Sequence, residues 1–287
     1  MIMGTDWYSN RRLDSTRVIL SETAMTDTPL FVGAGLLVGT MVGLTGVGGG
    51  SMMTPILMLL FGQSPSVAVG TDLLFSAVTK LVATASFGFS RRVDWRIVGR
   101  LLLGSVPGSA AVVIGLWLAR RTPSAADAIT TRSLAIILLV TAVALIFQTQ
   151  LQRAGLKLTA RALVHVERHK LLLTALAGLT LGVAVTLTSV GAGALGVVML
   201  LALYPVRLTA DRLVATDIAH ALPITLIAGL GHAFLGQVNF NVLAPLLLGS
   251  IPGILIASRI TLRLPARMTR ILIALMLGTV SERLLFG

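Results

Sequence analysis

The chain has 287 residues, of which 55% are hydrophobic and only 12% are charged, and its formal net charge is +12. Soluble domains carry about a quarter charged residues, so this composition excludes an ordinary soluble domain and predicts a membrane protein. Its basic residues stand in short clusters between apolar runs, as in cytoplasmic loops, which argues against nucleic acid as a partner. The absence of cysteine excludes disulfides, thiol catalysis and thiolate metal sites.

Residues 1–29 differ from the rest of the chain because they are polar and mixed in charge. Their only apolar run, Val18 to Leu20, is too short for the core of a signal peptide, so we expect a disordered tail. Met25 is an alternative first residue of the protein.

Eight apolar segments follow the tail, and a membrane-spanning helix takes about 20 residues. They cover 30–61, 67–89, 97–119, 133–147, 171–204, 213–235, 242–257 and 271–286. Most have the length of one span, although the fourth and seventh are short. The first and fifth are too long for one span, and each contains a glycine-rich break. A basic linker, residues 151–169, separates the fourth segment from the fifth.

The two halves of the chain repeat three landmarks in the same order. "GLLVGTMVGLTGVGGG" starts at Gly35 and "GLTLGVAVTLTSVGAG" at Gly178, an offset of 178 − 35 = 143. Thr71-Asp72 matches Thr216-Asp217, and "VDWRIVGRLLLGSVPG" matches "VNFNVLAPLLLGSIPG", both at an offset of 145 (216 − 71). We therefore predict an all-α polytopic membrane protein with two homologous repeats of four hydrophobic segments each, 30–150 and 170–287. Such repeats are typical of secondary transporters.

The glycine breaks, Thr45–Gly50 and Thr188–Gly193, predict non-helical backbone at membrane depth. Such backbone is tolerated only where it lines a cavity or is buried in protein, and a half-helix N-terminus with close glycines suits an anion. The alternative is close helix packing by small residues. The candidate substrate-binding residues at the breaks are Thr45, Gly46, Gly48, Gly49, Gly50, Thr188, Ser189, Gly191 and Gly193.

The orientation of the repeats depends on whether the first and fifth segments cross the membrane. If both are re-entrant hairpins that turn at their glycines, each half crosses three times and the repeats are inverted. This arrangement gives a larger excess of Lys and Arg on one side than eight full crossings would, and cytoplasmic loops are enriched in these residues. We favour the inverted repeats, which place the N-terminus outside.

Ionisable residues inside spans are functional candidates because their burial is costly. Lys80, two turns after Asp72, is a candidate for attracting an anionic substrate, or forms a structural ion pair with an acid. Two half-helix ends supply only about half a positive charge each, so a dehydrated anion needs the lysine as well.

Asp72, Asp217 and His220 are candidates for proton or cation coupling. The alternatives are helix capping by the two aspartates, each of which follows a threonine, and a packing role for the histidine.

In combination, these motifs resemble the sulfite exporter TauE/SafE family of membrane permeases. The matching pieces are "GLTGVGGGSMMTP", "AVGTDLLFSAVTK", "VDWR" and "GSVPG" in the first half, and "SVGAGALG", "ATDIAHALP" and "LLLGSIPG" in the second, so the resemblance covers about Gly35 to Arg263. It implies an anion permease for sulfur-containing oxyanions or organic acids, usually working outward, and it does not name the anion.

We therefore expect a secondary transporter of a small anion in the inner cell membrane. An intramembrane metal-handling permease or enzyme and an anion channel are the alternatives. The sequence predicts no catalytic residues, metal site or cofactor, because its four histidines do not cluster and no GxSxG motif is present. The expected partners are the anion and the lipid bilayer. The sequence leaves open whether the chain forms a homo-oligomer.

Overall fold

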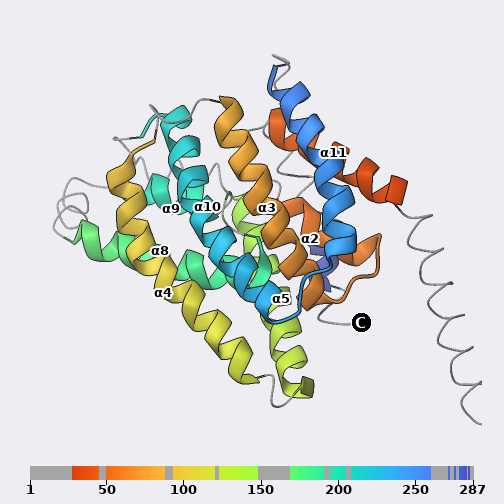
Figure 1. Cartoon of the computed structure of the whole chain (residues 1–287). Helices are drawn as coiled ribbons and strands as arrows, with labels where there is room; N and C mark the ends of the chain where they lie inside the picture. Colours follow the sequence, from red (N-terminus) through yellow and green to blue (C-terminus); the bar gives the residue numbers. More distant parts are fainter. Residues whose placement is uncertain are drawn as a thin grey trace, which may run out of the picture.

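The regular structure of the protein is helical (Figure 1). The computed structural model describes residues 28–44, 50–87, 93–119, 123–147, 169–190, 193, 195–204, 208–259, 271, 275, 278–282 and 284. No strand occurs among these residues, which confirms the all-α prediction.

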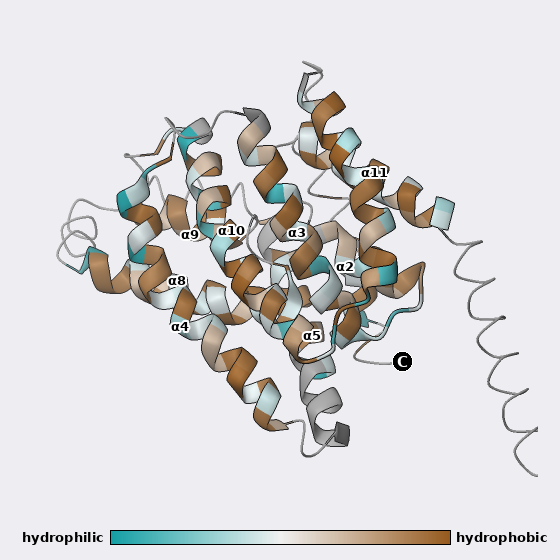
Figure 2. Ribbon diagram, in the orientation of Figure 1, coloured by the Kyte–Doolittle hydropathy of each residue, from teal (hydrophilic) through white to brown (hydrophobic). Residues whose placement is uncertain are grey.

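The helices follow the predicted apolar segments. They are an opening helix, Thr28–Leu44, then α2 (Gly50–Leu59), α3 (Pro65–Phe87), α4 (Trp95–Ala119), α5 (Pro123–Ile146), α8 (Lys170–Thr188), α9 (Leu195–Leu203), α10 (Ala210–Phe234) and α11 (Phe240–Arg259). In the described part, α3, α4, α8, α10 and α11 are long and apolar enough to cross a membrane. Most of their residues are hydrophobic (Figure 2), and large apolar side chains such as Phe234, which is 79% exposed, lie on the outside. A multi-pass membrane protein accounts for this surface.

The fifth segment turns back on itself. Thr174, in the second turn of α8, and Tyr204, just after α9, share a hydrogen bond of 2.8 Å between their hydroxyls. The ammonium of Lys170, the first residue of α8, lies 4.8 Å from the centre of the Tyr204 ring. The two ends of the segment therefore meet, and α8 with α9 forms a helical hairpin that we call hairpin 2.

The first segment closes in the same way. The rings of Phe31 and Phe61 lie with their centroids 4.4 Å apart. These two residues match Thr174 and Tyr204 at the offset of the glycine breaks (31 + 143 = 174; 61 + 143 = 204). The opening helix with α2 is hairpin 1.

Two further contacts place the hairpins at opposite ends of the molecule. Asp94, just before α4, meets the first turns of α10. Its backbone N–H donates to the Thr216 hydroxyl (3.1 Å), and its carboxylate lies 3.7 Å from the Arg212 guanidinium. Near the start of α3, the N–H of Asn239 donates to the Thr71 hydroxyl (3.0 Å).

Hairpin 1 leads directly into α3 at what we call the Asn239 end, and hairpin 2 leads into α10 at the Asp94 end. The 25-residue helix α10 separates the two ends. This is the geometry that inverted repeats require, although the orientation in a bilayer stays a prediction.

Glycines bring helices of opposite halves into close contact. A methyl group added at any of four of them would overlap backbone of the partner helix, so only glycine allows these approaches. The pairs are Gly35 with Leu246, Gly39 with Ser250, Gly178 with Leu101 and Gly182 with Ser105. The opening helix thus packs on α11 (Figure 1), and α8 packs on α4.

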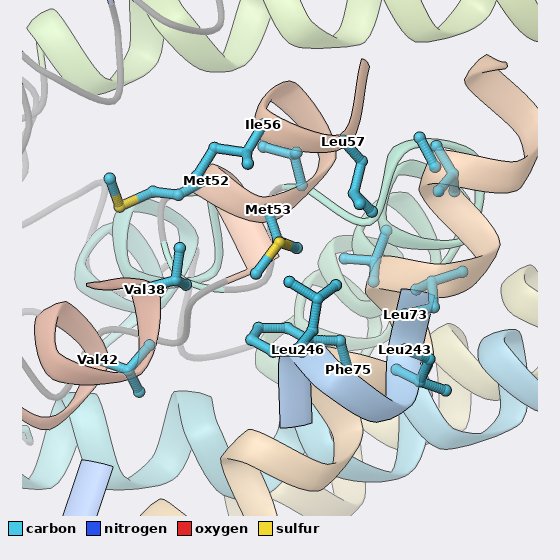
Figure 3. Close-up of a cluster of buried hydrophobic side chains, with 14 of the residues drawn as sticks. Val38, Val42, Met52, Met53, Ile56, Leu57, Leu73, Phe75, Leu243 and Leu246 are labelled. Carbon is cyan, nitrogen blue, oxygen red and sulfur yellow. The ribbon is translucent and has the colours of Figure 1, made fainter. Parts of the chain in front are cut away.

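The largest buried apolar cluster joins hairpin 1 to α3 and α11. Figure 3 shows Met52 and Met53 of α2 beside Phe75 of α3 and Leu246 of α11. Val190, just after α8, belongs to the same cluster. Hairpin 2 therefore reaches the core of the first half, and the polar residues described below are buried in the interior.

Candidate functional site

A carboxylate on α3 is held by donors from hairpin 1 and from its own helix. Asp72 is fully buried. One of its oxygens accepts the backbone N–H (3.1 Å) and the hydroxyl (2.5 Å) of Thr54, on α2. The other oxygen accepts the Ser76 hydroxyl, one helical turn further on (3.2 Å). Three donors satisfy this carboxylate and tie α2 to α3.

Lys80 lies two turns beyond Asp72 on the same helix and is only 4% exposed. Its charge interacts with the carboxylates of both Asp72 and Asp217, which come from different halves of the chain. Of the residues that the structure describes, no acid lies within the 4.0 Å of a direct ion pair with Lys80. Within this described part of the chain, Lys80 therefore has no direct ion pair with an acid.

Asp217, on α10, is 4% exposed and has different surroundings from Asp72. Its Oδ1 atom is buried and accepts no hydrogen bond. A methyl group on Gly196, in the first turn of α9, would overlap this same oxygen. The carboxylate therefore occupies space that the missing side chain of Gly196 leaves open, next to the returning helix of hairpin 2.

The tip of hairpin 2 contributes Ser189. This residue ends α8 in the left-handed conformation (φ 58°), with its N–H bonded to the carbonyl of Val185 (2.7 Å). Its side chain lies close enough to the Asp72 carboxylate to interact with it, yet its buried hydroxyl meets no hydrogen-bond geometry. Asp72, Lys80, Asp217 and Ser189 form what we call the central polar cluster.

A second line of polar contacts joins α10 to α4 and α8. His220 Nε2 lies 3.0 Å from the Ser105 hydroxyl on α4. Further along, the Thr186 hydroxyl donates to Ser109 (2.8 Å), and His232 Nε2 lies 3.0 Å from the Thr186 carbonyl. His220 thus has a packing partner on α4, in keeping with the packing role considered for it.

Only some of the predicted glycine-break residues are described. Thr45, Gly46, Gly48, Gly49 and Gly191 lie outside the described residues.

The described break residues correct part of the prediction, because Gly50 opens α2 and Thr188 is the last residue of α8, so neither is non-helical. The Thr188 hydroxyl is engaged by the backbone of Ala184 and Val190, which leaves it less suited to hold a substrate. Gly193 lies in the turn of hairpin 2.

Helix capping, the alternative considered for the two aspartates, is wrong. Asp72 and Asp217 each lie seven residues beyond the first residue of their helix (72 − 65 = 7; 217 − 210 = 7). Their carboxylates are therefore in the second turn or beyond, where backbone N–H groups bond within the helix.

Sequence reasoning missed Thr54 and Gly196. Both lie in the short return helices of the hairpins, where an apolar run gives no hint of a polar neighbour. A comparison of the two halves contains a signal, because Thr54 matches Val197 (54 + 143 = 197) and Ser76 matches Ala221 (76 + 145 = 221). The two hydroxyl donors around Asp72 are thus absent at the corresponding places near Asp217.

Metal-ligating side chains do not gather in threes anywhere among the residues that the structure describes. What the central polar cluster offers is one positive charge, two carboxylates and a hydroxyl, set where hairpin 2 meets both halves.

Comparisons with known proteins agree on one family. The sequence profile described as "Sulfite exporter TauE/SafE" matches residues 31–284. The chain is 39% identical over 241 residues to the "Probable membrane transporter protein YjnA" of Bacillus subtilis (strain 168), over 84% of this chain and 92% of that protein. It is 38% identical over 73 residues, 25% of each chain, to the "Probable membrane transporter protein YunE" of the same organism. No solved structure matches it significantly.

Proposed function

The chain belongs to the sulfite exporter TauE/SafE family of membrane transporters, and we propose that it is a secondary transporter of a small anion. The anion is a sulfur-containing oxyanion or an organic sulfonate or acid. It moves outward across the inner cell membrane, in a step coupled to protons. The central polar cluster is where the anion binds.

The observation that carries this proposal is the burial of Lys80, whose charge interacts with carboxylates of the two halves. An anion stripped of water inside a membrane protein needs a compensating positive charge. Lys80 is the residue that provides one at the junction of α3, α10 and hairpin 2. Because neither carboxylate is in direct ion-pair contact with it, the ammonium remains available to a substrate.

The opposed hairpins support a transporter over a static binding protein. Each hairpin reaches inward from its own end of the molecule, and irregular backbone at such a point lines substrate sites in repeat-based transporters. Movement of one hairpin relative to the other would expose Lys80 to alternate ends.

Uptake into proteoliposomes tests the proposal, with radiolabelled sulfite and sulfoacetate as probes. Lys80→Met should abolish uptake because it removes the charge while keeping most of the apolar volume, and Lys80→Arg should retain part of it. Arg96→Met, at an exposed position in the first turn of α4, is the control for loss of a basic side chain and should transport normally.

Normal uptake by Lys80→Met would remove Lys80 from the site. Wild-type uptake that unlabelled anion on the opposite side does not accelerate would favour a channel. No uptake of any anion would overturn the proposal.

A further inference from the structure

We propose that Asp217, and not Asp72, carries the proton that crosses the membrane with the anion. This assignment rests on the proposed function and specifies how the same site couples anion to proton. The feature behind it is the unequal hydrogen bonding of two carboxylates at matching places in the two halves.

The charge of the central polar cluster requires a proton when an anion binds. One lysine and two ionised aspartates sum to a formal charge of −1 (+1 − 2). A monovalent anion alone would bring the buried cluster to −2, and like charges repel strongly where water is excluded. One proton taken up with the anion returns the cluster to −1, so the two ligands favour each other's binding.

Asp72 is poorly suited to take this proton. Its oxygens accept three hydrogen bonds from Thr54 and Ser76, and donors of this kind favour the ionised carboxylate. Protonation would turn one acceptor into a donor facing other donors. It would also loosen the bond between α2 and α3.

Asp217 has the opposite surroundings. Its Oδ1 atom is buried without a donor, against Gly196. A buried carboxylate oxygen without a donor makes the anion costly, and the neutral acid much less so. The matching positions explain the difference, since Val197 and Ala221 stand where the first half has Thr54 and Ser76. The side chains of both replacements lack a donor.

The other charged and titratable groups near Asp217 do not offer a better carrier. Helix α3, which packs on α10, brings Lys80 and Asp72 to this region. The Asp94–Arg212 pair joins the starts of α4 and α10, and His220 lies on α10 itself. Helix α9 contributes none. His220 is engaged with Ser105 on α4, and the Asp94–Arg212 pair compensates its own charges.

A proton that moves with a monovalent anion makes the cycle electrically neutral. The membrane potential then neither drives nor opposes transport. The concentration gradients of the anion and of protons set the direction, and outward flux requires the product of anion and proton concentrations to be higher in the cytoplasm than outside.

Two assays on reconstituted protein separate anion movement from proton coupling. Tracer exchange of sulfite at equal pH that is accelerated by unlabelled sulfite on the opposite side requires binding and alternating access, but no net proton movement. Accumulation driven by an acidic exterior, with the voltage clamped at zero, requires the proton site. Asp217→Asn mimics a permanently protonated acid, so it should keep exchange and lose accumulation down to the level of protein-free liposomes. His220→Gln is the matched control on α10 and should keep both.

Each result has a definite meaning. A wild type without exchange overturns the proposed function and this inference with it. A wild type that exchanges but does not respond to the pH gradient overturns the inference alone. So does an Asp217→Asn protein that accumulates normally, or loss of accumulation in His220→Gln with exchange intact.

A second variant decides the matter if Asp217→Asn loses both activities. Ala221→Ser places a hydroxyl one turn from Asp217, as Ser76 stands one turn from Asp72. The new donor favours the ionised acid, so the pH of half-maximal accumulation should fall by about one unit, the effect of one hydrogen bond to a charged group. Ser76→Ala should leave that midpoint in place. An unchanged midpoint in Ala221→Ser would overturn the assignment.

Discussion

Thr54 is the residue on which the position of Asp72 depends most. It donates both its backbone N–H and its hydroxyl to a single carboxylate oxygen, at 3.1 and 2.5 Å. Because Thr54 lies on the return helix of hairpin 1, these bonds satisfy a buried charge and hold the hairpin against α3. A local change at this side chain therefore affects the placement of a whole element.

Thr54→Val tests this dependence at constant volume. Loss of the hydroxyl leaves a buried carboxylate with one donor fewer, at a cost of about 1–3 kcal/mol, and thermal unfolding in detergent should shift to lower temperature. Thr84→Val is the control, because the Thr84 hydroxyl bonds only the Lys80 carbonyl on its own helix (2.7 Å). Equal losses of stability in the two variants would show that the Thr54 hydroxyl has no special role.

At the scale of elements, the contact between α4 and α8 depends on glycine. Gly182 faces the backbone of Ser105, and Gly104 faces the carbonyl of Ala175. The carbonyl oxygens of the partner helix occupy the space that side chains would fill. Ser105 also contacts His220, so the spacing of these two helices fixes where α10 can lie.

Gly182→Ala should separate α4 from α8. The added methyl group would overlap the Ser105 backbone, and overpacking of this kind typically costs about 1–3 kcal/mol. Gly115→Ala, on α4 where an added methyl group meets nothing within 4 Å, is the matched control, and it should be neutral or slightly stabilising. The measurement is thermal unfolding in detergent together with sulfite exchange. An unaltered melting temperature for Gly182→Ala would contradict the close packing.

At the scale of the whole molecule, the two hairpins determine topology. Each closes at its base, through Phe31 with Phe61 and through Thr174 with Tyr204. We therefore predict that neither broken segment adds a net crossing of the membrane. The contact between Asp94 and Arg212 places the starts of α4 and α10 at the same end of the molecule. A chain with eight full crossings would have them at opposite ends.

Single cysteines in this cysteine-free chain test the topology in a bilayer. Arg96→Cys and Arg212→Cys, at the Asp94 end, should react with a membrane-impermeant maleimide only from the cytoplasmic side, because basic loops face the cytoplasm. Ser64→Cys, next to the start of α3 at the Asn239 end, should react only from the opposite side. Labelling of Arg96→Cys and Arg212→Cys from different sides would rule out inverted repeats.

Much of the architecture could be predicted from the sequence because its causes are local. Membrane helices are recognised as apolar runs of the right length. A cluster of glycines disfavours a continuous helix locally, whatever the rest of the chain does. The fourth segment is an exception, since α5 extends to Pro123, ten residues before the predicted start (133 − 123 = 10). Its first turns are too polar to count as an apolar run, yet nothing in them prevents a helix.

The functional groups were identified less completely than the helices. Lys80, Asp72 and Asp217 stood out because charges are rare in spans, and the structure brings all three together. The glycines could not be given roles in the same way. The role of Gly196 could not be predicted from the sequence, since it depends on the Asp217 carboxylate that occupies the space beside this glycine.

The sequence by itself determined that this is a polytopic membrane protein with two broken segments, repeated landmarks and a few buried charges. These are properties of composition and of order along the chain. Only the tertiary structure decided that both broken segments close as hairpins, that Lys80 faces carboxylates of both halves, and that Asp72 has its donors while Asp217 lacks one. The reason is physical: such contacts join residues far apart in the chain, and the packing of whole helices decides which of them meet.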